Sequence, residues 1–70
     1  MNFVQIKTRR YPNEPLVLNV NQIYWIHQFN KDEKPNITRI YLGSGEFVDV
    51  DMNYEDTLKA LNLEVRIINS

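Results

Sequence analysis

Apolar and polar residues alternate along most of this 70-residue chain, in short runs separated by residues typical of turns. Side chains of a β-strand point alternately to opposite faces, so a period of two indicates strands with one buried face. The runs cover residues 2–9, 16–20, 23–29, 37–42, 46–51 and 63–68. This alternation predicts five strands and a sixth, edge strand at residues 63–68.

The run 23–29 differs from the others because it is rich in aromatic and β-branched residues on both of its faces. Simple alternation places Ile23, Trp25, His27 and Phe29 on one face, and Tyr24, Ile26 and Gln28 on the other. Such a strand is typical of the centre of a sheet, or of a position covered by a helix or a partner.

Turn-forming residues separate the strands. Pro12 and Pro15 bracket an Asn-Glu pair, and proline fixes φ, so the first two strands are predicted to form a hairpin. Residues 43–45 read Gly-Ser-Gly, a compact turn between the fourth and fifth strands. Residues 30–36 are polar, charged and contain a proline, which predicts a solvated loop.

The pattern changes from strand to helix near residue 53. Asn53 is a favourable N-cap, and Leu58 and Leu61 lie three residues apart on one helical face. These features predict a short helix over residues 54–61, which ends at Asn62. We expect its leucine face to cover one side of the sheet.

These elements predict an α+β fold that is mainly β: a five- or six-stranded antiparallel twisted sheet or half-barrel with one short helix. Residues 1–70 are expected to form a single small domain, because a second core does not fit in this length. The hydrophobic fraction of 43% and net charge of −1 argue against disorder. The chain has no cysteine, so neither a disulfide nor a cysteine-based zinc site is expected.

Two targeting features are also not expected. No apolar run approaches the roughly 20 residues that cross a membrane, so we expect no membrane association. The opening residues MNFVQIKTRR contain no apolar stretch of the secretory type.

A chain of this size has little core to offset its conformational entropy. Burial of further apolar surface in a protein partner or in a homo-oligomer is therefore expected.

The residue content argues against an enzyme. Nucleophilic catalysis needs a nucleophile, a base and an orienting group, and His27 is the only histidine. Ser44 belongs to the Gly-Ser-Gly turn, so a Ser44–His27 pair is the weaker alternative to an ordinary hairpin turn. We expect no catalysis, no cofactor, no metal and no small-molecule substrate.

The stretch 46–56 is acidic and has no basic residue. Asp49 and Asp51 lie two apart and therefore share one strand face. Such carboxylates can form a site for a hard cation or a patch that binds a basic partner. A solvated sheet face with acidic residues at a helix N-terminus is the favoured interpretation.

Aromatic residues concentrate in the third and fourth strands. Aromatic side chains that stay exposed are the best anchors for a protein interface. The sheet face opposite the helix is expected to meet a partner or a second copy. The candidate interface residues are Tyr24, Trp25, Ile26 and Tyr41.

A small basic cluster follows the first strand. It contains Lys7, Arg9 and Arg10, with Tyr11 beside them. Clustered cations beside an aromatic ring are typical of single-stranded nucleic-acid binding, which is the alternative function, as in a phage or mobile-element regulator. The pI of about 5.7 weakens that alternative. Pairing of this basic strand with the acidic fifth strand or its neighbours is favoured.

The order of these features resembles the FlbD family of small flagellar and swarming-motility proteins, over roughly residues 7–61. The matching residues are Thr8, Arg9, Leu18, Asn19, Ile23, Ile26, Thr38, Ile40, Leu42, Gly45, Val48, Val50, Glu55, Asp56 and Leu58. The resemblance implies a small, β-rich, cytoplasmic protein without known catalytic residues. It supplies no site residues.

Overall fold

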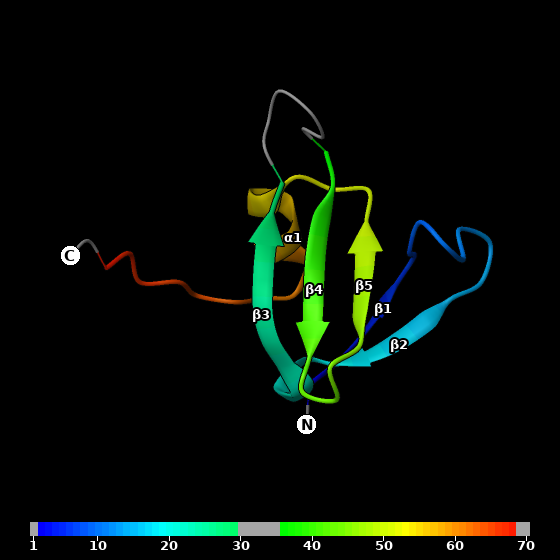
Figure 1. Ribbon diagram of the computed structural model, residues 1–70, viewed down its shortest axis with the longest axis horizontal. Coiled ribbons are helices and arrows are strands. Elements are labelled where there is room, and N and C mark those ends of the chain that lie inside the picture. Colours follow the sequence, from blue (N-terminus) through cyan, green and yellow to red (C-terminus); the bar gives the residue numbers. More distant parts are fainter. Residues whose placement is uncertain (1, 30–35, 69–70) are drawn as a thin grey trace.

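The computed structural model describes residues 2–29 and 36–68 and is mainly β with one short helix, as predicted (Figure 1). In chain order the elements are β1 (Phe3–Ile6), β2 (Leu16–Asn19), the 3-10 turn η1 (Val20–Gln22), β3 (Ile23–Gln28), β4 (Thr38–Leu42), β5 (Phe47–Val50) and α1 (Tyr54–Ala60). Most of the expected loop 30–36 lies outside the described residues.

The first two strands form the predicted hairpin. β1 and β2 pair antiparallel, with Ile6 opposite Leu16 at the turn end. The turn is closed by a hydrogen bond of 3.3 Å from the Glu14 amide to the Tyr11 carbonyl. The two prolines therefore flank a local turn, which their fixed φ angles favour.

The second sheet has the order β3-β4-β5 and is antiparallel throughout. The Gly-Ser-Gly turn joins β4 to β5, and the Gly45 amide donates to the Leu42 carbonyl at 3.0 Å. Gly45 has a φ of 89°, a conformation that glycine adopts without the steric cost of a Cβ. The predicted turn is thus confirmed.

The expected single sheet of five or six strands is wrong, because the strands form separate two-stranded and three-stranded sheets. After β2 the chain enters η1, where the Asn19 side chain accepts a hydrogen bond from the Asn21 amide. This turn reorients the chain, so β3 pairs with β4 instead of β2. A backbone hydrogen bond of 2.9 Å from the Arg9 amide to the Asp49 carbonyl joins the hairpin to β5.

One core is shared by both sheets and the helix end. Ile40 and Val50 are completely buried at its centre. The buried hydrophobic residues are Ile6, Leu18, Val20, Ile40, Val50 and Leu61. The fully buried Thr38 hydroxyl donates to the Met52 carbonyl at 2.8 Å, so this polar group enters the core with its hydrogen bond satisfied.

The helix begins and ends as predicted, to within one residue. The Asn53 side chain accepts a hydrogen bond of 2.8 Å from the Asp56 amide, which satisfies one of the free donors of the first turn. Asn62 follows the helix with a φ of 56°, and the Leu63 amide donates back to the Leu58 carbonyl at 3.0 Å. Within the described part of the chain, no helix is both long and apolar enough to span a membrane.

The sixth strand expected at residues 63–68 is wrong. These residues belong to no strand, although their apolar and polar residues alternate. The helix ends on the side of β3, and the chain then extends past β3 and away from the rest of the sheet (Figure 1). An alternating pattern indicates that a segment suits a sheet, but a strand also requires a neighbouring edge parallel to it.

Candidate functional site

A β-bulge in β3 decides which side chains share a face. Ile23 pairs with Leu42 and Trp25 pairs with Tyr41, so the register shifts by one residue between them. The extra residue is Tyr24. Ile23 and Ile26 consequently both pack towards the core, which simple alternation forbids. The expected grouping of Ile23 with Trp25 on one face is wrong for this reason.

Beyond the bulge the register defines two faces of the three-stranded sheet. The inner face, which packs on the core, carries Ile26, Gln28, Thr38, Ile40, Leu42, Val48 and Val50. The outer face carries Trp25, His27, Arg39, Tyr41, Phe47 and Asp49. The helix contributes Leu61 to the core on the inner side, whereas no described element covers the outer face (Figure 1).

The outer face contains a row of aromatic rings across all three strands. Trp25 lies opposite Tyr41, and Tyr41 lies opposite Phe47, whose ring centroid is 5.8 Å away. Tyr24 extends the row, because its ring meets Trp25 edge to face at 5.8 Å. Trp25 is 64% exposed to solvent and Tyr24 is 72% exposed. Large exposed aromatic residues in a contiguous row are typical of an interaction surface.

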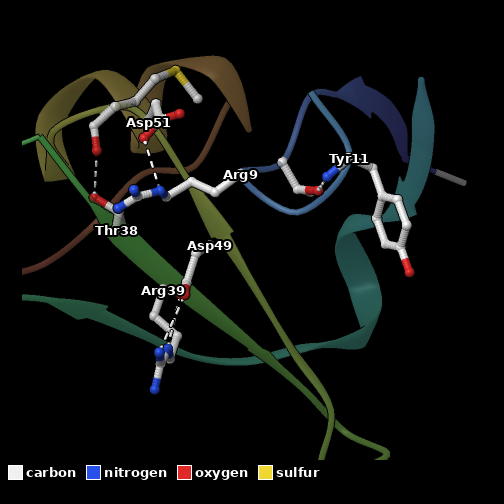
Figure 2. Close-up of polar contacts among 8 residues, drawn as sticks. Arg9, Tyr11, Thr38, Arg39, Asp49 and Asp51 are labelled. Carbon is white, nitrogen blue, oxygen red and sulfur yellow. Dashed lines mark hydrogen bonds and ion pairs between the residues drawn. The ribbon is translucent and has the colours of Figure 1, made fainter. Parts of the chain in front are cut away.

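An ion pair lies beside this row. Arg39 donates two hydrogen bonds to the Asp49 carboxylate, at 2.8 and 3.1 Å (Figure 2). Its guanidinium also lies 3.9 Å from the centre of the Phe47 ring, a cation–π contact. The hydrogen bonding that Arg39 donates to Asp49 raises the pKa of Arg39 above its usual range, so Arg39 keeps its charge. The two charges of this pair cancel, and the outer face as a whole has little net charge.

The candidate interface residues therefore divide between the two faces. Trp25 and Tyr41 lie together on the outer face, and Tyr24 lies beside them at the bulge. Ile26 lies instead on the inner face, half-buried against the core. The expectation that Ile26 shares the exposed face is wrong, because the pleat directs it opposite to Trp25.

The basic cluster is largely engaged within the chain. Arg9 forms an ion pair of 3.4 Å with Asp51, so one residue of the basic cluster meets the acidic stretch as predicted, although β1 and β5 belong to separate sheets (Figure 2). The Arg10 guanidinium lies 5.4 Å from the centre of the Tyr11 ring. The Tyr11 amide donates to the Thr8 hydroxyl at 3.2 Å, which fixes the start of the turn. Lys7 is exposed.

An open groove of about 820 Å³ lies between the hairpin turn and the β4–β5 turn. It brings Arg10 and Tyr11 to the side of the outer face on which Phe47 lies. Glu46 and Asp49 also line it, so the groove carries both signs of charge. Its lining residues are Thr8, Arg9, Arg10, Tyr11, Leu16, Gly45, Glu46, Phe47, Val48 and Asp49.

The remaining candidates are not brought together. His27 lies opposite Arg39 near one end of β3, whereas Ser44 lies in the turn after Leu42, at the opposite end of the sheet. Asp49 and Asp51 are each paired with a different arginine. Neither the Ser44–His27 pair nor the two aspartates place a nucleophile beside a base.

Arg39, Phe47 and His27 also belong to the outer face, although they are not among the interface residues predicted from the sequence. A signal for them was present. Alternation places Arg39 with Tyr41, and Phe47 with Asp49, on one face of each strand. Counting outward from the Gly-Ser-Gly turn then aligns Tyr41 with Phe47 and Arg39 with Asp49.

The fold defines a small domain of two antiparallel sheets and one helix, with an exposed aromatic sheet face as its most distinctive surface. Searches against protein-family models, curated protein sequences and solved structures find no match. The resemblance to the FlbD family therefore stays a prediction from the sequence.

Proposed function

We propose that this chain is a non-enzymatic protein-interaction module that associates with a second copy of itself through the outer face. The aromatic row from Tyr24 to Phe47 is the observation that supports this function, because exposed aromatic residues supply much of the energy of protein interfaces. A cytoplasmic location and a regulatory role of the FlbD type belong to the same proposal. They rest on the sequence resemblance.

The charge of the outer face favours a second copy over a strongly charged partner. Two identical faces related by a two-fold axis place the same residues against each other. Uncompensated charges in such a contact repel, whereas the Arg39–Asp49 pair is neutral in each copy. The rings around this pair are able to stack on their counterparts without leaving a buried charge unpaired.

The size of the chain is compatible with such a contact. A stable interface covers about 800 Å² on each partner. The chain exposes 5825 Å², so a dimer of this kind covers about one seventh of its surface.

The experiment compares two exposed apolar residues. Sedimentation over a range of concentrations measures the dimer dissociation constant for the natural chain, for Trp25→Ser and for Val17→Ser. Val17 is the matched control, because it is 67% exposed but lies in β2, outside the outer face. We expect Trp25→Ser to weaken the dimer by more than about tenfold and Val17→Ser to leave it unchanged.

Trp25 also provides a direct optical measurement, because it is the single tryptophan of the chain. Its emission is expected to shift to shorter wavelength as the concentration of the natural chain rises, because dimerisation removes the ring from water. A chain that stays monomeric, or an emission that does not change as dimers form, contradicts the proposal.

Single-stranded nucleic-acid binding is the second candidate, favoured by the groove in which Arg10 lies over Tyr11. Arg9 contributes less, because Asp51 already balances its charge. Binding to a single-stranded oligonucleotide at low salt is expected to be lost in Lys7→Glu/Arg10→Glu and kept in the control Lys59→Glu. No binding by the natural chain at low salt excludes this candidate.

A further inference from the structure

We infer that residues 64–68 are an exchanged strand, which pairs with the free edge of β3 in a second copy of the chain. This inference rests on the proposed self-association and deepens it, because it names a second contact that uses the edge of the sheet instead of its outer face. Three observations support it: the unpaired edge of β3, the composition of the segment, and its direction.

The first observation is the unpaired edge. β3 is six residues long and lies at the end of the order β3-β4-β5. Within residues 2–29 and 36–68, β4 is its only strand neighbour. An edge strand presents a row of backbone donors and acceptors that accepts a further strand. Ile23 and Ile26, which pack only partly against the core, lie along this edge.

The second observation is the composition of the segment. Leu63, Val65 and Ile67 alternate with Glu64 and Arg66, which is the pattern of a strand with one buried face. In the described part of the chain, residues 64–68 form no backbone hydrogen bond. Aliphatic side chains are consequently left in water, with Ile67 83% exposed and Ile68 87% exposed. A segment with this pattern loses exposed apolar surface when it joins a sheet.

The third observation is direction. Leu63 is held at the helix end by its hydrogen bond to Leu58 and packs against the core. From there the segment runs past β3, across the direction of the strand, and extends beyond its free edge (Figure 1). Pairing with its own β3 requires the segment to turn back along that strand. A second copy beyond the edge meets the segment in the direction it already takes.

The side chains match this arrangement. A strand added at β3 directs alternate residues to the inner and outer faces. With Val65 and Ile67 on the inner side, the added strand covers the exposed parts of Ile23 and Ile26 in the second copy, and its charged residues stay in water. Exchange in both directions is two-fold symmetric and closes at a dimer, so neither edge remains open for further growth.

Proline substitution tests the main-chain pairing. Only alternate residues of an added strand donate their backbone amides to the sheet. A proline placed at each of two successive positions in turn therefore removes a ladder hydrogen bond in one of the two variants. Arg66→Pro and Ile67→Pro are each compared with alanine at the same position. These residues are exposed and outside every strand and helix, so the fold of each copy stays intact. Circular dichroism of each variant verifies this.

In the Trp25→Ser background, where the outer-face contact is removed, we expect at least one proline variant to raise the dimer dissociation constant about tenfold or more above that of its alanine control. If both proline variants dimerise as tightly as their alanine controls, the inference is overturned. The two self-association contacts are separated by Trp25→Ser, which changes the outer face and leaves the segment and the edge of β3 intact.

Amide hydrogen exchange locates the contact. Residues 64–68 and the free edge of β3 are expected to become protected together as the concentration of the chain rises, in Trp25→Ser as well as in the natural chain. Protection that is already complete in dilute monomer indicates pairing within one chain and overturns the inference. Loss of the tryptophan emission shift with retained edge protection overturns only the proposed outer-face contact.

Discussion

The inner and outer faces of the three-stranded sheet use the same strands for different purposes. The inner face is filled by aliphatic and threonine side chains, of which Ile40, Val50 and Thr38 are completely buried. The outer face carries rings and an ion pair, and its largest residue, Trp25, is mostly exposed. Adjacent residues therefore differ in role: the inner face governs the stability of the domain, and the outer face is available for binding.

The largest expected effect is on the inner face. Ile40→Ala leaves a cavity at the centre of the core and is expected to lower the free energy of unfolding by about 2–5 kcal/mol. Trp25→Ala removes a larger but exposed side chain and is expected to cost less than about 1 kcal/mol. Urea denaturation of both variants measures the difference. Equal losses contradict the division between the two faces.

The second effect concerns the buried hydrogen bond of Thr38. Thr38→Val keeps the shape of the side chain but leaves the Met52 carbonyl without this donor, which is expected to cost about 1–3 kcal/mol. Thr38→Ser keeps the hydroxyl and loses a buried methyl group. Thermal unfolding of the pair separates the two contributions. A valine variant as stable as the natural chain shows that the hydrogen bond is not needed.

The third effect is on the outer face itself. Arg39→Lys keeps the charge but removes the two-pronged hydrogen bond to Asp49 and the flat contact with Phe47. A loss of about 1 kcal/mol in unfolding free energy is expected. A double-mutant cycle with Asp49→Asn isolates the pair. A coupling energy near zero means that the pair orders the outer face without stabilising it.

The smallest effect is expected for the exposed ion pair between the two sheets. The Arg9 and Asp51 side chains are 50% and 69% exposed and lie 3.4 Å apart, so water and salt screen their attraction. Arg9→Ala is expected to cost no more than about 0.5 kcal/mol, and less at high salt. The comparison is with Lys7→Ala in the same denaturation assay. A loss as large as that of Thr38→Val indicates a structural role for this pair.

Local features of the fold were predictable from the sequence. Strand periodicity, the Gly-Ser-Gly turn and the Asn53 cap each depend on neighbouring residues, and the structure confirms them. The bulge at Tyr24 was not predictable by alternation, because one inserted residue reverses the parity of every residue before it. That single shift explains why Ile23 was assigned to the same face as Trp25.

Long-range pairing was the other limit. The alternation at 63–68 is genuine, but whether a segment has a partner strand depends on where the chain emerges from the helix. The separation into two sheets likewise depends on the direction that η1 imposes after β2. For the candidate site, the sequence identified Trp25 and Tyr41. Arg39 was missed because its pairing with Asp49 becomes visible only when the register of the fourth and fifth strands is counted outward from the Gly-Ser-Gly turn.

The short turn η1 links the two sheets. Its first residue, Val20, is buried in the core and donates its amide to the Asn2 carbonyl at the start of β1. At its other end the Gln22 carbonyl accepts from the Gly43 amide, in the turn after β4. Three residues thus tie the hairpin to the three-stranded sheet. The two sheets share no complete ladder, yet we expect them to melt as one cooperative unit, because opening either one exposes the residue that anchors the other.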